Sequence, residues 1–131
     1  MEAFGATEKM RLAMPDGRIG HAEIEVEGGT IMIADEFPEM GFAGPQSLGG
    51  SPVTVHLYVA DVDALAARSV AAGAKVLRPV ADQFYGDRSC RIEDPFGHLW
   101  MLATPKEDVS PQEMQRRADA LFGKRPETSK A

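Results

Sequence analysis

The sequence is short of three features that would each define a class of protein. It has a single cysteine, Cys90, so no disulfide can form within the chain, which fits a reducing cytoplasm. No apolar run approaches the roughly 18 residues that a membrane-spanning helix needs. The first residues carry no basic start followed by an apolar stretch, which a secretory signal would show. We therefore expect a cytoplasmic protein.

Positive charge is also scarce. The chain has 14 Lys and Arg against 20 Asp and Glu, a net charge of −6. A surface of that sign repels phosphate backbones, so we expect neither nucleic acid nor a membrane as a partner. The one basic cluster, Lys124-Arg125, lies in residues 124–131, which we interpret as a flexible, solvated tail.

The first third of the chain predicts a meander of three strands. The 131 residues, 44% of them hydrophobic, are enough for one domain with a core. Residues 7–14, 18–27 and 30–34 have the composition or the alternation of strands. Pro15-Asp16-Gly17 forms the first turn, because proline presets φ and glycine accepts a positive φ. Gly28-Gly29 forms the second turn.

Residues 36–52, which we call the linker, have no periodicity and are rich in proline and glycine. A loop of this length is uncommon in a compact domain unless it has a task. It carries Phe37, Met40 and Phe42, which are costly to leave in water. Either the linker lies across a groove, or it is a connector whose aromatic side chains plug the core.

The second half predicts a strand, a helix and three further strands. VTVHLYV (residues 53–59) is the clearest strand, and Asp61 is a good cap for a helix that ends at Gly73. A strand at 74–80 follows, and then a hairpin of 88–93 and 98–103 around the turn DPFG. Ser110 to Glu113 reads as a capping box for a helix over 111–122.

A weak internal repeat relates the two halves. FGATEKMRL (residues 4–12) matches AGAKVLRP (72–79), since both read as the end of a helix, Gly-Ala, and a strand with Lys and Arg. In each copy a turn and two more strands follow. The second copy is preceded by a strand and a helix, and the first copy is not. We therefore expect a single domain over 1–110 with a truncated first unit (1–35), the linker and a second unit (53–104), followed by a helix at 111–123.

The stretches VTVHLYVADVDALAARSVAAGAKV and EDPFGHLWMLAT resemble the vicinal oxygen chelate superfamily. This superfamily includes glyoxalase I, extradiol dioxygenases, fosfomycin-resistance thiol transferases and bleomycin-binding proteins. MPDGRIGHAEIEV, MIADE and DQFYGDR are similar to a glyoxalase-like bacterial branch whose activities are mostly unassigned. The resemblance extends over residues 4–104. It implies an α+β fold in which two βαβββ units, each a curved sheet, form a cavity, here followed by a C-terminal helix.

The chain departs from this pattern because its first unit lacks the leading strand and helix. A sheet without its leading strand has an unpaired edge and an uncovered apolar face. The simplest remedy is a second copy of the chain, so we expect a homodimer that completes each cavity, either by exchanging strands or by abutting. The alternative is that Met1 is an internal start of a longer natural protein.

The resemblance also bears on metal binding. Metal-dependent members hold one divalent ion with His or Gln and Glu side chains from several strands, and one such His matches His56. Their Glu lies four residues after the hairpin glycine, and counting from Gly97 gives Met101, whose thioether is a poor ligand for a hard ion. The third position falls on the missing strand. We therefore expect no cofactor; the alternative is one divalent metal, held by His56 with donors such as His21, Glu23 or Glu93.

The expected pocket is apolar with a few polar groups. Strand alternation predicts that Leu99 and Met101 point inward, and we expect hairpin pairing to bring Cys90 to the same face, with Arg88 at the pocket's end. Trp100 then packs under a helix on the other face. Cys90 has no recognisable His–Asp pair, so we do not expect it to be a nucleophile. The full predicted lining is Thr54, His56, Tyr58, Arg88, Cys90, Leu99, Met101, Phe42 and Phe84.

Two functions are compatible with these observations. The first is a metal-free binding protein that holds a hydrophobic or aromatic small molecule, such as an antibiotic, in a dimer-completed cavity. The second is a metal-dependent enzyme of the glyoxalase, thiol-transferase or dioxygenase kind that uses His56. A weaker third hypothesis is a metal-free enzyme with His56 as general base.

Overall fold

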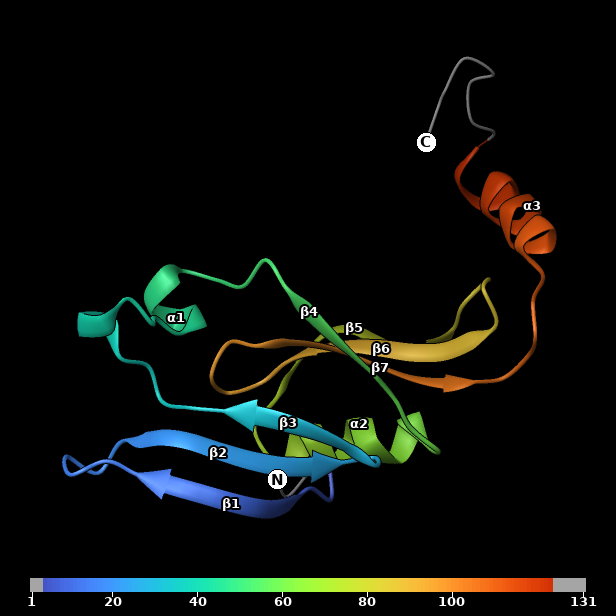
Figure 1. The fold of residues 1–131 in the computed structure, drawn as a ribbon. Coiled ribbons are helices and arrows are strands. Elements are labelled where there is room, and N and C mark those ends of the chain that lie inside the picture. The colour runs from blue at the N-terminus through green and yellow to red at the C-terminus, as the bar shows by residue number, and fades with distance from the viewer. Residues whose placement is uncertain (1–3, 124–131) are drawn as a thin grey trace.

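A computed structural model describes residues 4–123, which fold into two β-sheets accompanied by helices (Figure 1). The first sheet is the expected meander: β1 (Thr7–Ala13), β2 (Ile19–Val26) and β3 (Gly29–Ile33) lie in the order β1-β2-β3. Both pairings are antiparallel. The expected tail at 124–131 lies outside the described residues.

The second sheet is a complete βαβββ unit. It consists of β4 (Thr54–Tyr58), β5 (Lys75–Asp82), β6 (Asp87–Glu93) and β7 (Leu99–Pro105), in the order β4-β7-β6-β5. β4 runs parallel to β7, and the other pairs are antiparallel. Helix α2 (Val62–Ala71) connects β4 to β5. The α+β fold predicted from the sequence is therefore confirmed.

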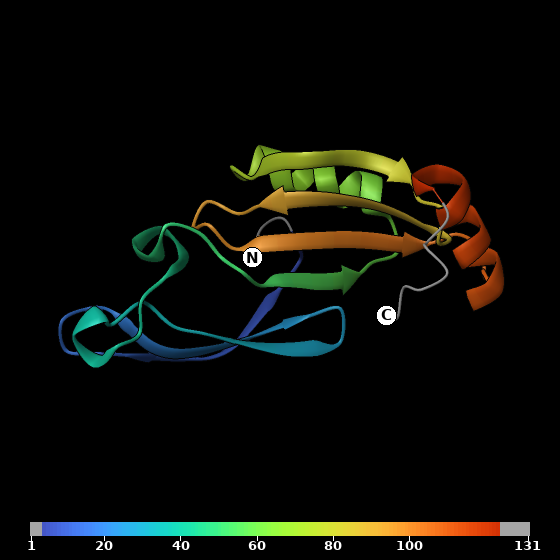
Figure 2. The same ribbon diagram turned by 90° about the horizontal axis from the view of Figure 1, so that it is seen from above.

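Helix α2 covers one face of the second sheet and forms the main core with it. The Asp61 side chain caps this helix by accepting a hydrogen bond from the Ala64 backbone N–H. The helix packs on β5, β6 and β7 (Figure 2). Its buried residues meet alternate residues of the strands, and the cluster is Val59, Val62, Leu65, Cys90, Ile92 and Leu102. Trp100 packs against this cluster, as predicted, with its ring centroid 4.9 Å from that of Phe4.

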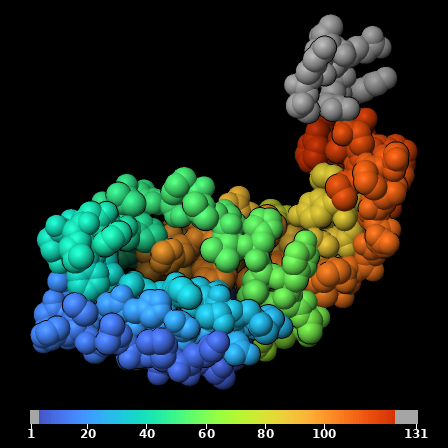
Figure 3. Space-filling model, in the orientation of Figure 1, coloured from blue at the N-terminus to red at the C-terminus, as the bar shows by residue number. Residues whose placement is uncertain are grey.

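The first sheet has no such cover. Among residues 4–123, no helix contacts β1, β2 or β3 in the way that α2 contacts the second sheet. Two residues of β2, Ala22 and Val26, are buried, but all of β1 is exposed. The surface above the first sheet is hollowed, and orange atoms from the β6–β7 end of the second sheet form its floor (Figure 3). Apolar side chains of the first sheet therefore remain in contact with solvent.

The linker forms two short helical turns, η1 (Pro38–Met40) and α1 (Pro45–Leu48). The carboxylate of Glu36 holds this segment together by accepting hydrogen bonds from the Gly44 backbone N–H and the Ser47 hydroxyl. The linker reaches the β6–β7 turn, where the Gln46 side chain donates to the Pro95 carbonyl. Met40 is 66% exposed and therefore does not plug the core.

The β6–β7 turn requires glycine at position 97. Gly97 has a φ of 92°, which side chains with a Cβ rarely adopt. A Cβ added there would also lie 3.1 Å from the Cβ of Pro45 in the linker. The turn is pinned by Asp94, whose carboxylate accepts hydrogen bonds from the backbone of Phe96 and His98. This turn fixes how β6 and β7 pair, and therefore which residues share a face.

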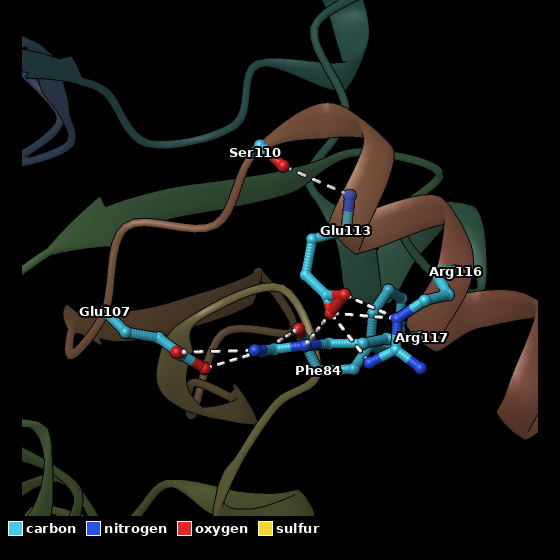
Figure 4. Close-up of polar contacts among 6 residues, drawn as sticks. All are labelled: Phe84, Glu107, Ser110, Glu113, Arg116 and Arg117. Atoms are coloured by element: carbon cyan, nitrogen blue, oxygen red, sulfur yellow. Dashed lines mark hydrogen bonds and ion pairs between the residues drawn. The ribbon is translucent and has the colours of Figure 1, made fainter.

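Helix α3 (Pro111–Phe122) begins at the predicted residue and ends one residue before the predicted end at 123, and it extends from the end of β7 away from the first sheet (Figure 1). The Ser110 hydroxyl caps it by accepting from the Glu113 backbone N–H (Figure 4). Glu113 does not close the capping box, because its side chain pairs with Arg116 and Arg117 instead. Arg117 also donates to the Phe84 carbonyl, which ties α3 to the β5–β6 turn. No helix among residues 4–123 is long and apolar enough to span a membrane.

Candidate pocket on the open face of the second sheet

The face of the second sheet opposite α2 holds a small cavity of about 220 Å³. It lies at the carboxyl ends of β4 and β7, beside the β5–β6 turn. Its lining is His56, Leu57, Tyr58, Tyr85, Asp87, Met101 and Ala103. Pockets for drug-sized ligands usually measure about 300–1,000 Å³. A single chain therefore provides room for only part of such a ligand.

The strand register places the polar groups around Met101. His56 pairs with Met101, and Met101 pairs with Arg91 on its other side. Cross-strand partners have neighbouring side chains on one face, so these three form a row across the sheet. Tyr58 and Ala103 form the next row. Met101 thus lies between an imidazole and a guanidinium group.

Two tyrosines bring hydroxyl groups to the cavity. The Tyr58 hydroxyl donates to the Asp87 carboxylate at 3.4 Å, and the negative charge of Asp87 raises the pKa of Tyr58. The hydroxyl oxygens of Tyr85 and Ser89 are 3.5 Å apart and share a hydrogen bond. His56 makes no hydrogen bond to any residue that the structure describes, so its imidazole nitrogens are available to a ligand.

Three predicted pocket residues lie at or beside the cavity, and two more share its face. His56, Tyr58 and Met101 line it, as the alternation of β4 and the position after the hairpin indicated. Thr54 and Leu99 pair with each other one row further along the same face. Leu57, Tyr85, Asp87 and Ala103 were missing from the predicted lining. The register would have added Asp87 and Ala103, because they alternate with residues on the open face.

The prediction that Cys90 faces the pocket is wrong. Cys90 pairs with Leu102, whereas Met101 pairs with Arg91, so Cys90 and Met101 point to opposite faces. The predicted pairing was off by one residue, which is enough to reverse the face of every side chain in a strand. Cys90 is 1% exposed in the core under α2, and this burial raises the pKa of its thiol. Such a thiol is a poor nucleophile.

The prediction that Arg88 lies at the end of the pocket is wrong for the same reason. It lies on the α2 side of β6, where its Nε and Nη2 donate to both carboxylate oxygens of Asp63 at 2.8 and 3.0 Å. A third bond from Nη1 reaches Asp82. These ion pairs raise the pKa of Arg88 and lower that of Asp63. Arg88 therefore fastens α2 to the β5–β6 hairpin instead of serving the pocket.

The two predicted phenylalanines are also placed elsewhere. Phe42 pairs with Phe37 within the linker and is 63% exposed. Phe84 packs its ring against those of Tyr85 and Phe122, at centroid distances of 5.1 and 5.8 Å. Phe84 thus packs between Tyr85 and Phe122, and it connects Tyr85 to helix α3. Tyr85 is the residue of this pair that lines the cavity.

The donors of one chain do not fit a divalent metal ion. Within residues 4–123, no three His, Cys, Asp or Glu side chains lie close enough together to hold one. His56 has Met101 as its cross-strand neighbour, and a thioether suits soft ions such as Cu(I) better than hard ones. In the first sheet, Nε2 of His21 is 2.9 Å from a carboxylate oxygen of Glu23, so these two side chains engage each other.

Known proteins resemble this chain over most of its length. A family model described as the glyoxalase/bleomycin resistance protein/dioxygenase superfamily matches residues 1–102. The uncharacterized protein Mb0911c of Mycobacterium bovis is 44% identical over 118 residues, which cover 88% of this chain and 78% of that protein. The structure of the At5g48480 gene product of Arabidopsis thaliana is similar at 30% identity and a TM-score of 0.63, covering 78% of this chain and 80% of that one. TioX from Micromonospora sp. ML1 is similar at 29% identity and a TM-score of 0.59, covering 83% and 84%. The chain therefore belongs to the glyoxalase/bleomycin resistance protein/dioxygenase superfamily.

Proposed function

We propose that this protein binds a hydrophobic or aromatic small molecule, without a metal, in a cavity that a second copy of the chain completes. The observation that carries the proposal is Met101 at the centre of the open face, between His56 and Arg91. A polarisable thioether in this position favours contact with flat, apolar groups. Antibiotics are one class of such molecules, in keeping with the resistance proteins in the name of the superfamily.

The walls of the cavity support an aromatic ligand. Tyr58 and Tyr85 offer rings for stacking or edge contacts, and Met101 and Ala103 offer an apolar floor. Asp87 and the two hydroxyl groups supply hydrogen bonds that would fix the orientation of the ligand. A mainly apolar lining with a few polar groups is the usual character of a small-molecule site.

The exposed face of the first sheet supports the homodimer. Met10 pairs with Glu23, and Glu23 pairs with Met32, so both methionines lie on one face. Leu12, next along β1, alternates onto the same face, and the exposed fractions are 44% for Met10, 55% for Leu12 and 66% for Met32. Met10 and Leu12 are neighbours along β1, and Glu23 lies between Met10 and Met32. Exposed apolar side chains grouped on one face and bordered by polar ones favour an interaction site. The proposal requires that the second copy which covers this face also contributes walls to the cavity of about 220 Å³.

Ligand binding is tested directly by calorimetric titration with a panel of aromatic compounds that includes bleomycin. We expect saturable binding that weakens by about tenfold or more in Tyr85→Ala, because truncating a central aromatic contact has effects of this size. Phe96→Ala is the matched control, since Phe96 is 70% exposed in the β6–β7 turn. A folded protein that binds no member of the panel would refute the proposal. A monomer at micromolar concentration in sedimentation would refute the dimer.

The position of His56 favours a second candidate, a metal-dependent enzyme. Its imidazole lines the cavity without a hydrogen-bond partner among the described residues, and a second chain would have to bring the remaining donors. Elemental analysis of protein purified without chelator separates the two candidates. One Ni, Zn, Mn or Fe per chain that is lost in His56→Ala would favour the enzyme over the metal-free binding protein.

A further inference from the structure

Two arginines lie side by side on the open face of the second sheet. Arg78 of β5 and Arg91 of β6 are cross-strand partners between two register shifts of β5, and both are half-buried. The hydrogen bond from Arg78 to Ser89, the partner of Ala103, places Arg78 on the open face. Like charges placed directly opposite each other on neighbouring strands destabilise a sheet. The sheet therefore carries an electrostatic cost at this point unless negative charge is supplied.

Within residues 4–123, no carboxylate forms an ion pair with either arginine. Nη2 of Arg78 donates to the Ser89 hydroxyl at 3.0 Å, and Nη2 of Arg91 donates to the Thr54 hydroxyl at 3.4 Å. Acidic groups are not scarce, since the chain has 20 of them. Ion pairs with carboxylates are made instead by Arg11, Arg18, Arg88, Arg116 and Arg117.

The arginine pair adjoins the cavity of the proposed function. Arg91 lies next to Met101 in the row that begins at His56. Arg78 is connected to the cavity wall through Ser89, whose hydroxyl also meets that of Tyr85. Neighbouring strands are about 4.8 Å apart, so the guanidinium groups lie within reach of a ligand that rests on Met101.

In the part of the chain that the structure describes, Asp87 and Glu93 of β6 lie on this face, to either side of Arg91. Asp87 is four residues from Arg91 along β6, or about 13 Å, and accepts its hydrogen bond from Tyr58. Glu93 lies two residues beyond Arg91 on the same face and forms no ion pair with either arginine in the described part of the chain. A guanidinium group has five N–H donors, and each arginine uses one of them for a hydroxyl.

We propose that the ligand is an anion whose oxyanion group, a carboxylate, sulfonate or phosphate, binds between Arg78 and Arg91 while its aromatic body occupies the cavity beside Tyr58 and Tyr85. This inference rests on the proposed binding function. Guanidinium groups suit such ligands, because their planar donors match paired oxygen atoms. The anion also removes the repulsion between the arginines, so binding relieves a cost that the unliganded sheet carries.

A matched pair of probes tests the inference: 2-naphthoate and 2-naphthalenemethanol share the aromatic body, and only the first is an anion. By calorimetry at low salt we expect the wild type to bind 2-naphthoate about tenfold or more tightly than the alcohol, as charge-assisted hydrogen bonds predict. Arg78→Gln and Arg91→Gln should each lose this preference and keep their affinity for the alcohol. Arg116→Gln is the control, because it removes the same charge from a side chain that is 71% exposed on α3.

The outcomes separate this inference from the proposed function. Equal affinity for both probes in the wild type, or a preference that survives both substitutions, overturns the anion site and leaves aromatic binding standing. No binding of either probe or of the aromatic panel overturns both. If either variant fails to fold, the salt dependence of the wild type tests the inference. Its preference for 2-naphthoate over the alcohol must shrink as the salt concentration rises from about 0.05 to about 0.5 M. A preference that does not depend on salt contradicts the inference.

Discussion

Substitutions at two adjacent residues of β7 test the assignment of faces in the second sheet. Leu102 is 0% exposed in the core under α2, whereas its neighbour Met101 is half-buried on the open face. We expect Leu102→Ala to destabilise the protein and to leave ligand binding by the folded fraction intact. Met101→Ala should do the reverse: it should weaken binding and cost little stability.

The magnitudes follow from burial. Leu→Ala removes about three CH₂-sized groups at roughly 0.8 kcal/mol each, and the cavity left behind raises the loss to about 3–5 kcal/mol. The site is enclosed by Val62 of helix α2 and by Cys90 and Ile92 of strand β6, which are held in place by the packing of helix on sheet and cannot collapse easily. Met101 loses apolar contact on one side only, so its truncation should cost about 1 kcal/mol.

Urea unfolding followed by circular dichroism, at one fixed protein concentration, measures both effects. With a slope of about 1.5 kcal/mol per M, Leu102→Ala should lower the unfolding midpoint by about 2 M or more, and Met101→Ala by less than about 1 M. Equal losses for the two variants would refute the assignment of faces. A loss below about 1 kcal/mol for Leu102→Ala would refute the core described here.

Three further predictions concern other parts of the fold. Cys90 should resist iodoacetamide in the native protein and react fully in urea, because burial both covers the thiol and raises its pKa. Mass spectrometry after timed labelling checks this prediction, and rapid labelling of the native protein would contradict it. Asp94→Ala should lower the free energy of unfolding by about 2–4 kcal/mol, because it removes the acceptor of two turn N–H groups and of the Trp100 indole N–H at 3.0 Å. Urea unfolding measures this loss, and an unchanged unfolding midpoint would contradict the prediction. Arg116 and its neighbour hold the pKa of Glu113 to about 2, below the ordinary value near 4.3, so the contribution of this carboxylate to α3 is present above pH ~4.3 and is lost as the pH falls towards 2. Carbon-13 NMR titration of Glu113 should show this low midpoint, and Arg116→Gln should raise it; a midpoint near 4.3 in the wild type would contradict the ion pair.

Many of the elements could be predicted from the sequence because their signals are local. Asp61 and Ser110 have the short polar side chains that cap helices, and both caps are present. The alternation of residues 53–59 predicted β4 and placed His56 and Tyr58 on one face, and their pairing with Met101 and Ala103 of β7 agrees with this. Each of these signals involves residues within a few positions of one another, so it does not depend on the rest of the fold.

The faces of the residues in β6 depend on the register of the β6–β7 hairpin. The predicted register was off by one residue, so the prediction placed Cys90 and Arg88 in the pocket instead of on the α2 side of the sheet. Sequence alternation groups the residues of one strand into two sets, but the pairing across the turn decides which set faces the helix. The pairing of β5 with β6 likewise brings Arg78 beside Arg91, although the two residues are 13 positions apart in the sequence. The sequence by itself therefore determined the elements and the family resemblance. Only the tertiary structure decided which side chains meet at the cavity, because that depends on contacts between strands distant along the chain.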